Sequence, residues 1–235
     1  MSRAIQPILL ATSNPKKVRE IREIFEPIGL GVQSLDELAM DLTEPEETGE
    51  TFEANAMLKA VGYAQQTGRV CLADDSGLEV DALDGQPGIM SARYSQLDGD
   101  KPLTRSQRDT LNTIKLLHEL QGVPPEARSA RFVCAMCVAA ADSDAAIRAG
   151  LETMLPSEKP IQLATSRGTF EGAIGMPGEV PRGANGFGYD PVFLVAPECT
   201  STSAELDPEA KNAISHRGHA AREIAAKLRV LRTLQ

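Results

Sequence analysis

Two adjacent aspartates, Asp74 and Asp75, follow a short apolar run and precede a serine and a glycine. The run, residues 70–73, is typical of a buried strand, and acid groups at the carboxyl end of a strand lie where open α/β sheets bind ligands. Neighbouring carboxylates repel each other, so a cation or a hydrogen-bond network must offset the repulsion. The pair therefore indicates a divalent metal site. The alternative is a solvated Asp-Asp-Ser-Gly turn, which is a common loop type.

A polar segment, residues 12–17, lies between an apolar strand pattern and an amphipathic helix pattern. Ser13 or Asn14 can cap the helix, and Pro15 is tolerated in its first turn. The free amides of a helix N-terminus, the helix dipole and the two lysines that follow Pro15 favour a bound phosphate. The glycine and lysine spacing of a P-loop is absent. The alternative is a plain helix cap beside solvated lysines.

Two further polar clusters come late in the sequence. Residues 181–191 are rich in glycine, which permits close approach of a ligand, and contain Phe187 and Tyr189, whose rings could stack on a planar base. Their glycine spacing differs from that of the dinucleotide-binding fingerprint. Residues 211–218 place a lysine, a histidine and an arginine just before the last helix pattern. Taken separately, a glycine-rich turn and a helix cap are ordinary features.

Composition excludes several classes of function. With 235 residues and 42% hydrophobic content, the chain is long enough for one substantial domain or two small lobes that share a cleft. The 24 basic and 33 acidic residues give a net charge of −9, which argues against nucleic acid as the main partner because such binding needs concentrated positive charge. Neither a membrane-spanning apolar segment nor a signal-peptide core is found, so we expect a cytoplasmic protein without a membrane partner.

The four cysteines do not indicate a disulfide framework in a chain of this length. Cys134 and Cys137 form a Cys-x-x-Cys sequence, but they lie in an apolar segment typical of a buried strand. Positions three apart on a strand face opposite sides, so the two thiols are poorly placed to share a zinc ion. We expect all four cysteines to be core or half-buried residues.

Hydrophobic periodicity predicts the elements that must position these clusters. Strands are predicted at residues 6–11, 31–34, 70–73, 131–140, 166–174 and 192–195. Helices are predicted at residues 15–28, 51–66, 104–121 and 218–233. In the second helix, Asn55 and Lys59 are four residues apart and project from one flank. A polar stretch at 142–165 is predicted to be an excursion between two strands.

Taken together, these segments resemble the inosine triphosphate pyrophosphatase family, also called the non-canonical purine nucleoside triphosphate pyrophosphatases. The family's motifs occur in order along almost the whole chain as Ala11-Thr-Ser-Asn-Pro-Lys-Lys17, Glu46-Glu-Thr-Gly49, Thr51-Phe…Asn55-Ala…Lys59-Ala, Ala73-Asp-Asp-Ser-Gly-Leu78, Pro87-Gly…Ser91-Ala-Arg-Tyr94, Gly186-Phe-Gly-Tyr-Asp-Pro191 and Ser215-His-Arg-Gly218. Two features depart from the family pattern: Ala54 stands where a glutamate usually precedes the asparagine of the second helix, and the 142–165 excursion is longer than usual.

The resemblance implies an α/β fold with an elongated mixed central sheet, flanking helices and two lobes that enclose a nucleotide-binding cleft. It implies a single domain over residues 1–235 and a homodimer. The implied reaction is Mg²⁺-dependent hydrolysis of the triphosphates of inosine, deoxyinosine and xanthosine (ITP, dITP and XTP) to the monophosphate and pyrophosphate. Such an enzyme cleanses the nucleotide pool of damaged purines.

The resemblance also assigns roles to residues. Asp75 is the expected catalytic residue, as a Mg²⁺ ligand or as the acceptor of the proton of the attacking water, with Glu46 and Asp74 as further metal-site acids. Arg217 is expected to donate to the 6-oxo group of the base, and residues 187–190 to form the platform for its ring. The full set of expected substrate-binding residues is Thr12, Ser13, Asn14, Pro15, Lys16, Lys17, Asn55, Lys59, Ser76, Phe187, Gly188, Tyr189, Asp190, Lys211, His216 and Arg217.

Two other functions stay open. The first is a nucleotide sensor that binds a triphosphate without cleaving it, although Asp75 beside Asp74 argues against it, because phosphates bind to cations and donors rather than to carboxylates. The second is a house-cleaning pyrophosphatase of similar fold that acts on pyrimidine triphosphates. Turnover of ITP compared with that of uridine triphosphate (UTP) distinguishes the second alternative.

Overall fold

The structure is a computed structural model that describes residues 5–12, 14–96, 103–151 and 157–232. The chain divides into two compact units. Unit 1 comprises Met1–Asp75, Cys134–Gly168 and Arg217–Gln235, and unit 2 comprises Ser76–Val133 and Thr169–His216. Three long strands contribute residues to both units.

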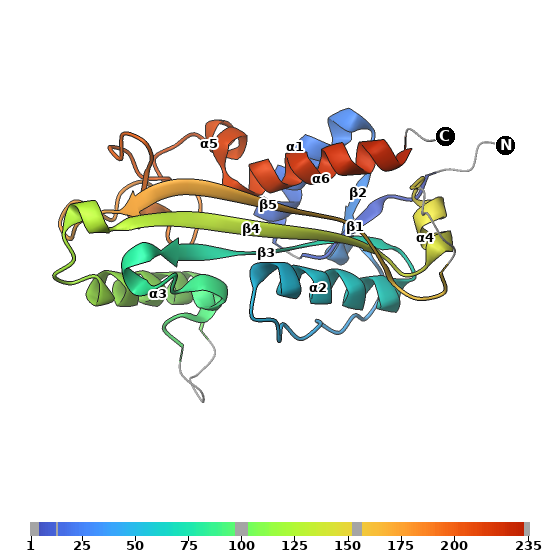
Figure 1. Cartoon of the computed structure of the whole chain (residues 1–235), viewed down its shortest axis with the longest axis horizontal. Coiled ribbons are helices and arrows are strands. Elements are labelled where there is room, and N and C mark those ends of the chain that lie inside the picture. Colours follow the sequence, from blue (N-terminus) through green and yellow to red (C-terminus); the bar gives the residue numbers. More distant parts are fainter. Residues whose placement is uncertain (1–4, 13, 97–102, 152–156, 233–235) are drawn as a thin grey trace. The chain divides into compact units, whose positions relative to one another are not determined.

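A six-stranded mixed sheet has the strand order β2-β1-β3-β4-β5-β6 (Figure 1). Its strands are β1 (Ile8–Leu10), β2 (Val32–Ser34), β3 (Val70–Val80), β4 (Ser129–Ala140), β5 (Ile161–Ile174) and β6 (Phe193–Val195). β1 pairs in parallel with β2 and β3, and β5 pairs antiparallel with β6. The helices are α1 (Pro15–Phe25), α2 (Phe52–Thr67), α3 (Arg105–Glu119), α4 (Ser143–Arg148), α5 (Pro208–Ile214) and α6 (His216–Arg232). The predicted α/β class with a mixed sheet and flanking helices is confirmed.

Helices cover both faces of the sheet within unit 1: α1 and α6 lie on one face and α2 lies on the other (Figure 1). Side chains alternate between the two faces along each strand. The residues that pack with α1 and α6 are therefore every second residue of the strands, namely Ile8, Leu10, Val70, Leu72, Cys134, Met136 and Val138. On the α2 side, the buried helix residues include Ala56, Ala60 and Ala64, whose small side chains allow close packing.

The cysteines follow the same alternation. Cys134 belongs to the core cluster on the α1 and α6 side, whereas Cys137, three positions later, points to the opposite face. Cys71, Cys134 and Cys137 are buried, and Cys199 is half-buried. The prediction that the cysteines are core or half-buried residues is confirmed.

Unit 2 has a core of its own, built on the second half of β3 and on α3. Phe193 contacts the rings of Phe132 and Phe170 at centroid distances of 4.6 and 5.4 Å. Leu78 and Val80 continue the buried side of β3 in this core. Arg128 is fully buried, and its guanidinium donates to the carbonyls of residues 120, 174 and 175 at 2.8 to 3.1 Å. Backbone acceptors thus satisfy this buried charge.

Several elements differ from the sequence predictions. β5 begins at Ile161 rather than at residue 166, so its first residues lie in the predicted excursion. β3 was predicted to end at residue 73, and this is wrong, since the strand continues to Val80. Burial of Leu78 and Val80 in the unit 2 core keeps the chain extended past the two acids. The sequence analysis also missed α5, although Asp207 caps this helix and Pro208 occupies its first position, which is a recognisable start signal. Part of the 142–165 excursion forms α4, while residues 152–156 lie outside the described structure.

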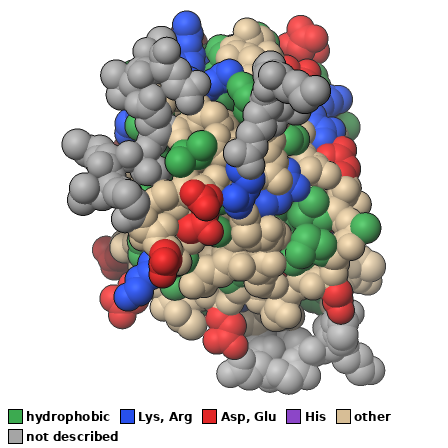
Figure 2. Space-filling model, turned by 90° about the vertical axis from the view of Figure 1, so that its right-hand side faces the viewer, with side chains coloured by type: hydrophobic (Ala, Val, Ile, Leu, Met, Phe, Trp, Pro, Cys, Tyr) green, Lys and Arg blue, Asp and Glu red, His purple; other side chains and the backbone are tan. Residues whose placement is uncertain are grey.

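Charged side chains of both signs are interspersed on the face that Figure 2 shows, where Lys and Arg gather in small groups near Asp and Glu. Within the described residues, no helix combines the length and the apolar character needed to cross a membrane.

Candidate active site

The two adjacent aspartates lie inside β3, and this location gives them different surroundings. Residues in a strand alternate between faces, so Asp74 points to the same side as Val70 and Leu72, toward α1 and α6. Asp75 points to the opposite side, where α2 lies. The alternative of a solvated turn at this position is therefore wrong, because both acids lie in β3, Asp74 is only 5% exposed and Asp75 is half-buried.

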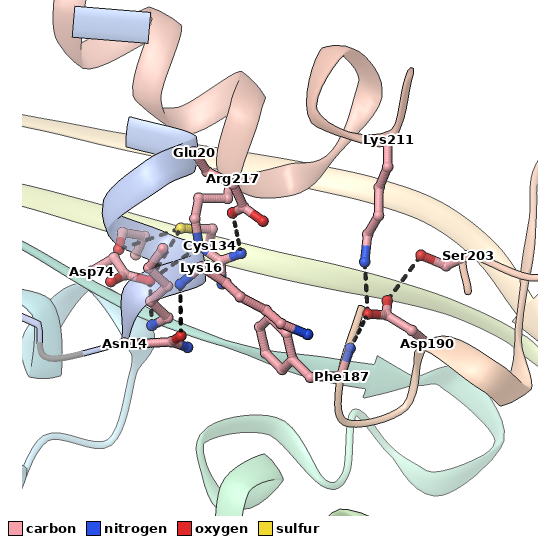
Figure 3. Close-up of polar contacts among 12 residues, drawn as sticks. Asn14, Lys16, Glu20, Asp74, Cys134, Phe187, Asp190, Ser203, Lys211 and Arg217 are labelled. Atoms are coloured by element: carbon pink, nitrogen blue, oxygen red, sulfur yellow. Dashed lines mark hydrogen bonds and ion pairs between the residues drawn. The ribbon is translucent and has the colours of Figure 1, made fainter. Parts of the chain in front are cut away.

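Asp74 lies in a cluster of cations (Figure 3). Its Oδ2 atom is 2.7 Å from Lys17 Nζ and 3.5 Å from Arg217 Nε. The Arg217 guanidinium also contacts Glu20 Oε2 at 2.9 Å, and the Cys134 thiol lies 4.0 Å from Asp74 Oδ2. Burial alone would raise the pKa of Asp74, but the charges of Lys17 and Arg217 outweigh it and hold the pKa well below its ordinary value. Asp74 is therefore an ionised group that joins α1, β3 and α6.

Asp75 faces α2, which supplies the two residues that sequence spacing placed on one flank. Asn55 Nδ2 donates to Asp75 Oδ2 at 3.3 Å, and Lys59 Nζ donates to the backbone carbonyl of Asp74 at 3.2 Å. Burial raises the pKa of Asp75 to about 6, against the opposing effect of the Lys59 charge, and Glu47 adds to the rise. The pKa values of two neighbouring carboxyl groups are thus shifted in opposite directions. This pattern is found where two acids have distinct catalytic roles.

Glu47 is the second acid beside Asp75, and the sequence analysis missed it. Glu47 Oε1 lies 2.9 Å from Lys59 Nζ, whereas Glu46 has an exposed side chain. Gly49 allows this approach, because its N–H donates to Asn55 Oδ1 at 2.8 Å and a Cβ atom there would lie 2.7 Å from the same oxygen. Nothing in the local sequence distinguishes the two neighbouring glutamates, so only the conformation of the segment identifies Glu47.

A metal site made wholly of protein ligands is not found among the described residues, which contain no group of three or more His, Cys, Asp or Glu arranged to hold an ion. Mg²⁺ does not need one, since it commonly keeps several waters and is bound by one or two carboxylates together with substrate phosphates. Asp75 and Glu47, which both lie close to Lys59, form a donor set of that kind. Asp74, by contrast, is engaged by cations, and Glu46 is exposed.

The strand-to-helix segment has the cap that the sequence predicts. Asn14 is the N-cap of α1, and its Oδ1 accepts the Lys16 N–H at 3.1 Å, while Pro15 is the first helical residue. Thr12 Oγ1 accepts the Asn14 N–H at 3.2 Å. Ser13 lies outside the described residues. Lys16 is exposed, but the neighbouring Lys17 turns back to Asp74 rather than toward solvent.

The glycine-rich segment of unit 2 is closed around Asp190 (Figure 3). Asp190 Oδ2 accepts the Phe187 N–H at 2.8 Å and lies 2.6 Å from Lys211 Nζ, and Oδ1 accepts the Ser203 hydroxyl at 2.8 Å. A Cβ atom at Gly186 would lie 2.0 Å from Asp190 Oδ2, so only glycine fits there. Asp190 and Lys211, both expected to bind substrate, therefore also support the loop.

The aromatic residues of this segment differ in exposure. Tyr189 is 4% exposed, belongs to the unit 2 core and donates its hydroxyl to the Ser91 carbonyl at 2.9 Å. Its ring therefore does not form the predicted stacking surface, because it is enclosed by other side chains. Phe187 is half-buried, and its role in stacking on the base stays a prediction.

Two further residues expected to bind substrate lie elsewhere in the chain. His216 stacks on Phe132 at a centroid distance of 5.1 Å, and Ser76 is half-buried in β3.

Comparisons with known proteins agree with the resemblance drawn from the motifs. The profile of the Ham1 family matches residues 8–227. A dITP/XTP pyrophosphatase of Exiguobacterium sp. is 43% identical over 221 residues, which cover 94% of this chain and 96% of the relative. One of Nitratidesulfovibrio vulgaris is 44% identical over 217 residues, covering 92% and 93% of the two chains.

Solved structures give the same result for the fold. A HAM1 protein from Coxiella burnetii has a TM-score of 0.74 and 35% identity, and the match covers 96% of this chain and 100% of that one. A nucleoside-triphosphatase described as a dITP/XTP pyrophosphatase from Mycobacterium abscessus has a TM-score of 0.65 and 37% identity, covering 95% and 99%.

Proposed function

The chain belongs to the Ham1 family, and from this premise we propose that it hydrolyses deaminated purine nucleoside triphosphates, namely ITP, dITP and XTP, to the monophosphate and pyrophosphate. Curated relatives that match over nearly the whole chain are named dITP/XTP pyrophosphatases, which supports the proposal. The observation that carries the proposal for this chain is the difference in surroundings between Asp74 and Asp75. Asp74 is neutralised by cations, whereas Asp75 stands beside an amide donor and a second acid.

Asp75 is the proposed acceptor of the proton of the attacking water. A general base must be held in one orientation and lie within reach of its proton donor. The Asn55 amide nitrogen donates to one Asp75 oxygen, and the N–H of Gly49, in the segment before α2, donates to Asn55 Oδ1 and holds that side chain in place. Lys59 contacts both Glu47 and the backbone carbonyl of Asp74, and it places a positive charge beside the Asp75 carboxylate. These contacts orient Asp75 without substrate.

Asp75 and Glu47 are the residues that would hold a Mg²⁺ ion. When bound, the ion would supply positive charge that offsets the negative charge developing on the leaving pyrophosphate. Glu47 replaces Glu46 in this proposal, because the side chain of Glu47 lies beside Lys59. Asp74 acts differently: it holds Lys17 of α1 and Arg217 of α6 near β3.

The N-terminal turn of α1 is the proposed seat of the phosphate chain. Thr12, Asn14 and Lys16 lie at the N-terminal, positive end of an 11-residue helix, where the helix dipole and the lysine charge favour a bound phosphate. Ser13, Pro15 and Lys17 belong to the same proposal. The residues predicted to contact the base remain proposals as well: Phe187, Gly188, Asp190, Lys211, His216 and Arg217. In the free protein, Arg217 is occupied by Asp74 and Glu20, so a contact to a 6-oxo group requires a rearrangement of its side chain.

The experiment that tests this proposal is pyrophosphate release from ITP and from UTP, each with Mg²⁺ and with excess chelator. We expect Mg²⁺-dependent release of inosine monophosphate and pyrophosphate, with UTP turned over far more slowly. Tight ITP binding without product would instead indicate a nucleotide sensor, and preference for UTP would indicate a pyrimidine triphosphate pyrophosphatase. A homodimer and a cytoplasmic location also remain predictions, the first testable by light scattering.

A further inference from the structure

Helix α3 supplies a contact to the glycine-rich segment that the reaction scheme does not use. Asp109 Oδ2, on the first turns of α3, accepts the backbone N–H of Gly188 at 3.1 Å. Gly188 has a φ of 63°, a left-handed conformation that glycine adopts readily and other residues avoid. The Asp109 side-chain oxygen therefore holds the amide of a residue type whose backbone is less restricted than that of any other.

A second residue of α3, Asn112, supports the next position of the segment. Asn112 Nδ2 donates to the Ser91 carbonyl at 3.1 Å, and this same carbonyl accepts the Tyr189 hydroxyl at 2.9 Å. Asn112 Oδ1 in turn accepts the N–H and the hydroxyl of Ser95, both at 2.8 Å. Two side chains of one helix, three residues apart, thus hold two consecutive residues of the segment, directly at Gly188 and indirectly at Tyr189.

The other side of the segment is held by Asp190, whose carboxylate accepts the Phe187 N–H and the Ser203 hydroxyl. Gly188, a glycine with positive φ, lies between these two held residues, Phe187 and Asp190. Ordering the backbone of a residue has an entropic cost, which is larger for glycine than for other residues, so a preset conformation avoids that cost when a ligand binds.

We propose that Asp109 is a positioning residue for base recognition, which it serves by presetting the backbone of Gly188 in the segment Gly186–Asp190. This inference rests on the proposed function, because it takes the segment to contact the base of the substrate. Asp109 itself touches no reacting atom. Its loss should therefore weaken binding and base choice much more than it slows the chemical step.

Three variants separate this role from a general structural one. Asp109→Ala removes the acceptor, and Asp109→Asn keeps an acceptor oxygen in a side chain of the same size. Thr110→Ala changes the next residue of α3, whose hydroxyl donates to the Ser106 carbonyl in the same helix. For Asp109→Ala we expect a KM for ITP raised by about tenfold, a kcat within about threefold of wild type, and a lower ratio of ITP to ATP in kcat/KM. Asp109→Asn and Thr110→Ala should retain values near wild type.

Amide hydrogen exchange over residues 186–190 measures the positioning directly and does not depend on activity. Faster exchange at Gly188 in Asp109→Ala, reversed in Asp109→Asn, supports the inference. Unchanged exchange overturns it, and so does a lowered melting temperature with unchanged KM and unchanged ITP-to-ATP ratio. If wild-type protein does not hydrolyse ITP, the proposed function fails, while the exchange data still decide whether Asp109 fixes Gly188.

Discussion

Replacing Asp75 by asparagine should make the metal-free protein more stable while it abolishes turnover. Burial raises the pKa of Asp75 from its ordinary value of 3.8 to about 6, so the folded protein holds this proton more tightly than the unfolded chain does. Below both pKa values the group is protonated in both states and has no effect. As the pH rises past 3.8 the unfolded chain ionises first, so folding is increasingly penalised until the pH exceeds about 6.

The size of this penalty follows from the two pKa values. A rise of about 2 units corresponds to about 3 kcal/mol at neutral pH, at about 1.4 kcal/mol per unit. Asp75 is only half-buried and water screens part of the effect, so we expect Asp75→Asn to gain about 1–3 kcal/mol in the free energy of unfolding at pH 7.5. At pH 5 the gain should fall to about half, because the folded wild-type group is then mostly protonated. Over the same change, kcat for ITP should fall by about a hundredfold or more.

Urea denaturation at pH 7.5 and pH 5, with a chelator present to exclude metal, measures the gain. Asp41→Asn is the matched control, since Asp41 is an exposed acid of the same unit and its replacement should stay within about 0.5 kcal/mol of wild type. A less stable Asp75→Asn protein at pH 7.5, or a gain that does not depend on pH, would refute the reasoning. Near-normal kcat at saturating Mg²⁺ would refute the catalytic assignment.

Three further predictions, one of them with a matched control substitution, have defined outcomes. Asp74→Asn should destabilise the protein by about 3–5 kcal/mol at neutral pH, measured by urea denaturation, because it removes the counter-charge of Lys17 and leaves Arg217 with Glu20 alone. Since the pKa of Asp74 is lowered, wild type should lose this advantage only as the pH falls into the acid range. Glu47→Gln should raise the Mg²⁺ concentration for half-maximal rate by about tenfold, while Glu46→Gln leaves it unchanged, and equal effects would remove the distinction between them. Arg217→Ala should lose ITP turnover and narrow the gap between ITP and ATP in kcat/KM; an unchanged ratio would place base recognition elsewhere.

Local signals in the sequence identified much of this structure. The Asn14 cap and the Pro15 start of α1 follow from residue type and position, because a cap is a local hydrogen bond. The joint placement of Asn55 and Lys59 follows from helical spacing, and both do approach the acid pair.

The features that the sequence did not predict depend on contacts between residues far apart in the chain. Two acids beside a serine and a glycine read as a turn, but Asp74 stays in a strand because Lys17, 57 residues away, and Arg217 neutralise it. Glu46 and Glu47 are chemically identical neighbours, and only the approach of Gly49 to Asn55 selects the second. The bond between Asp109 and Gly188 spans 79 positions and has no sequence signal of its own.

The most direct test of the central claim is one panel of kcat/KM values for the wild-type protein with Mg²⁺, measured as pyrophosphate release from ITP, dITP, XTP, ATP, GTP and UTP. We predict values for the three deaminated purine triphosphates that exceed those for the other three by at least about a hundredfold, because a site built on specific hydrogen bonds leaves polar groups unpaired with a wrong base. Comparable values for ATP or UTP, or release of inorganic phosphate in place of pyrophosphate, would contradict the account.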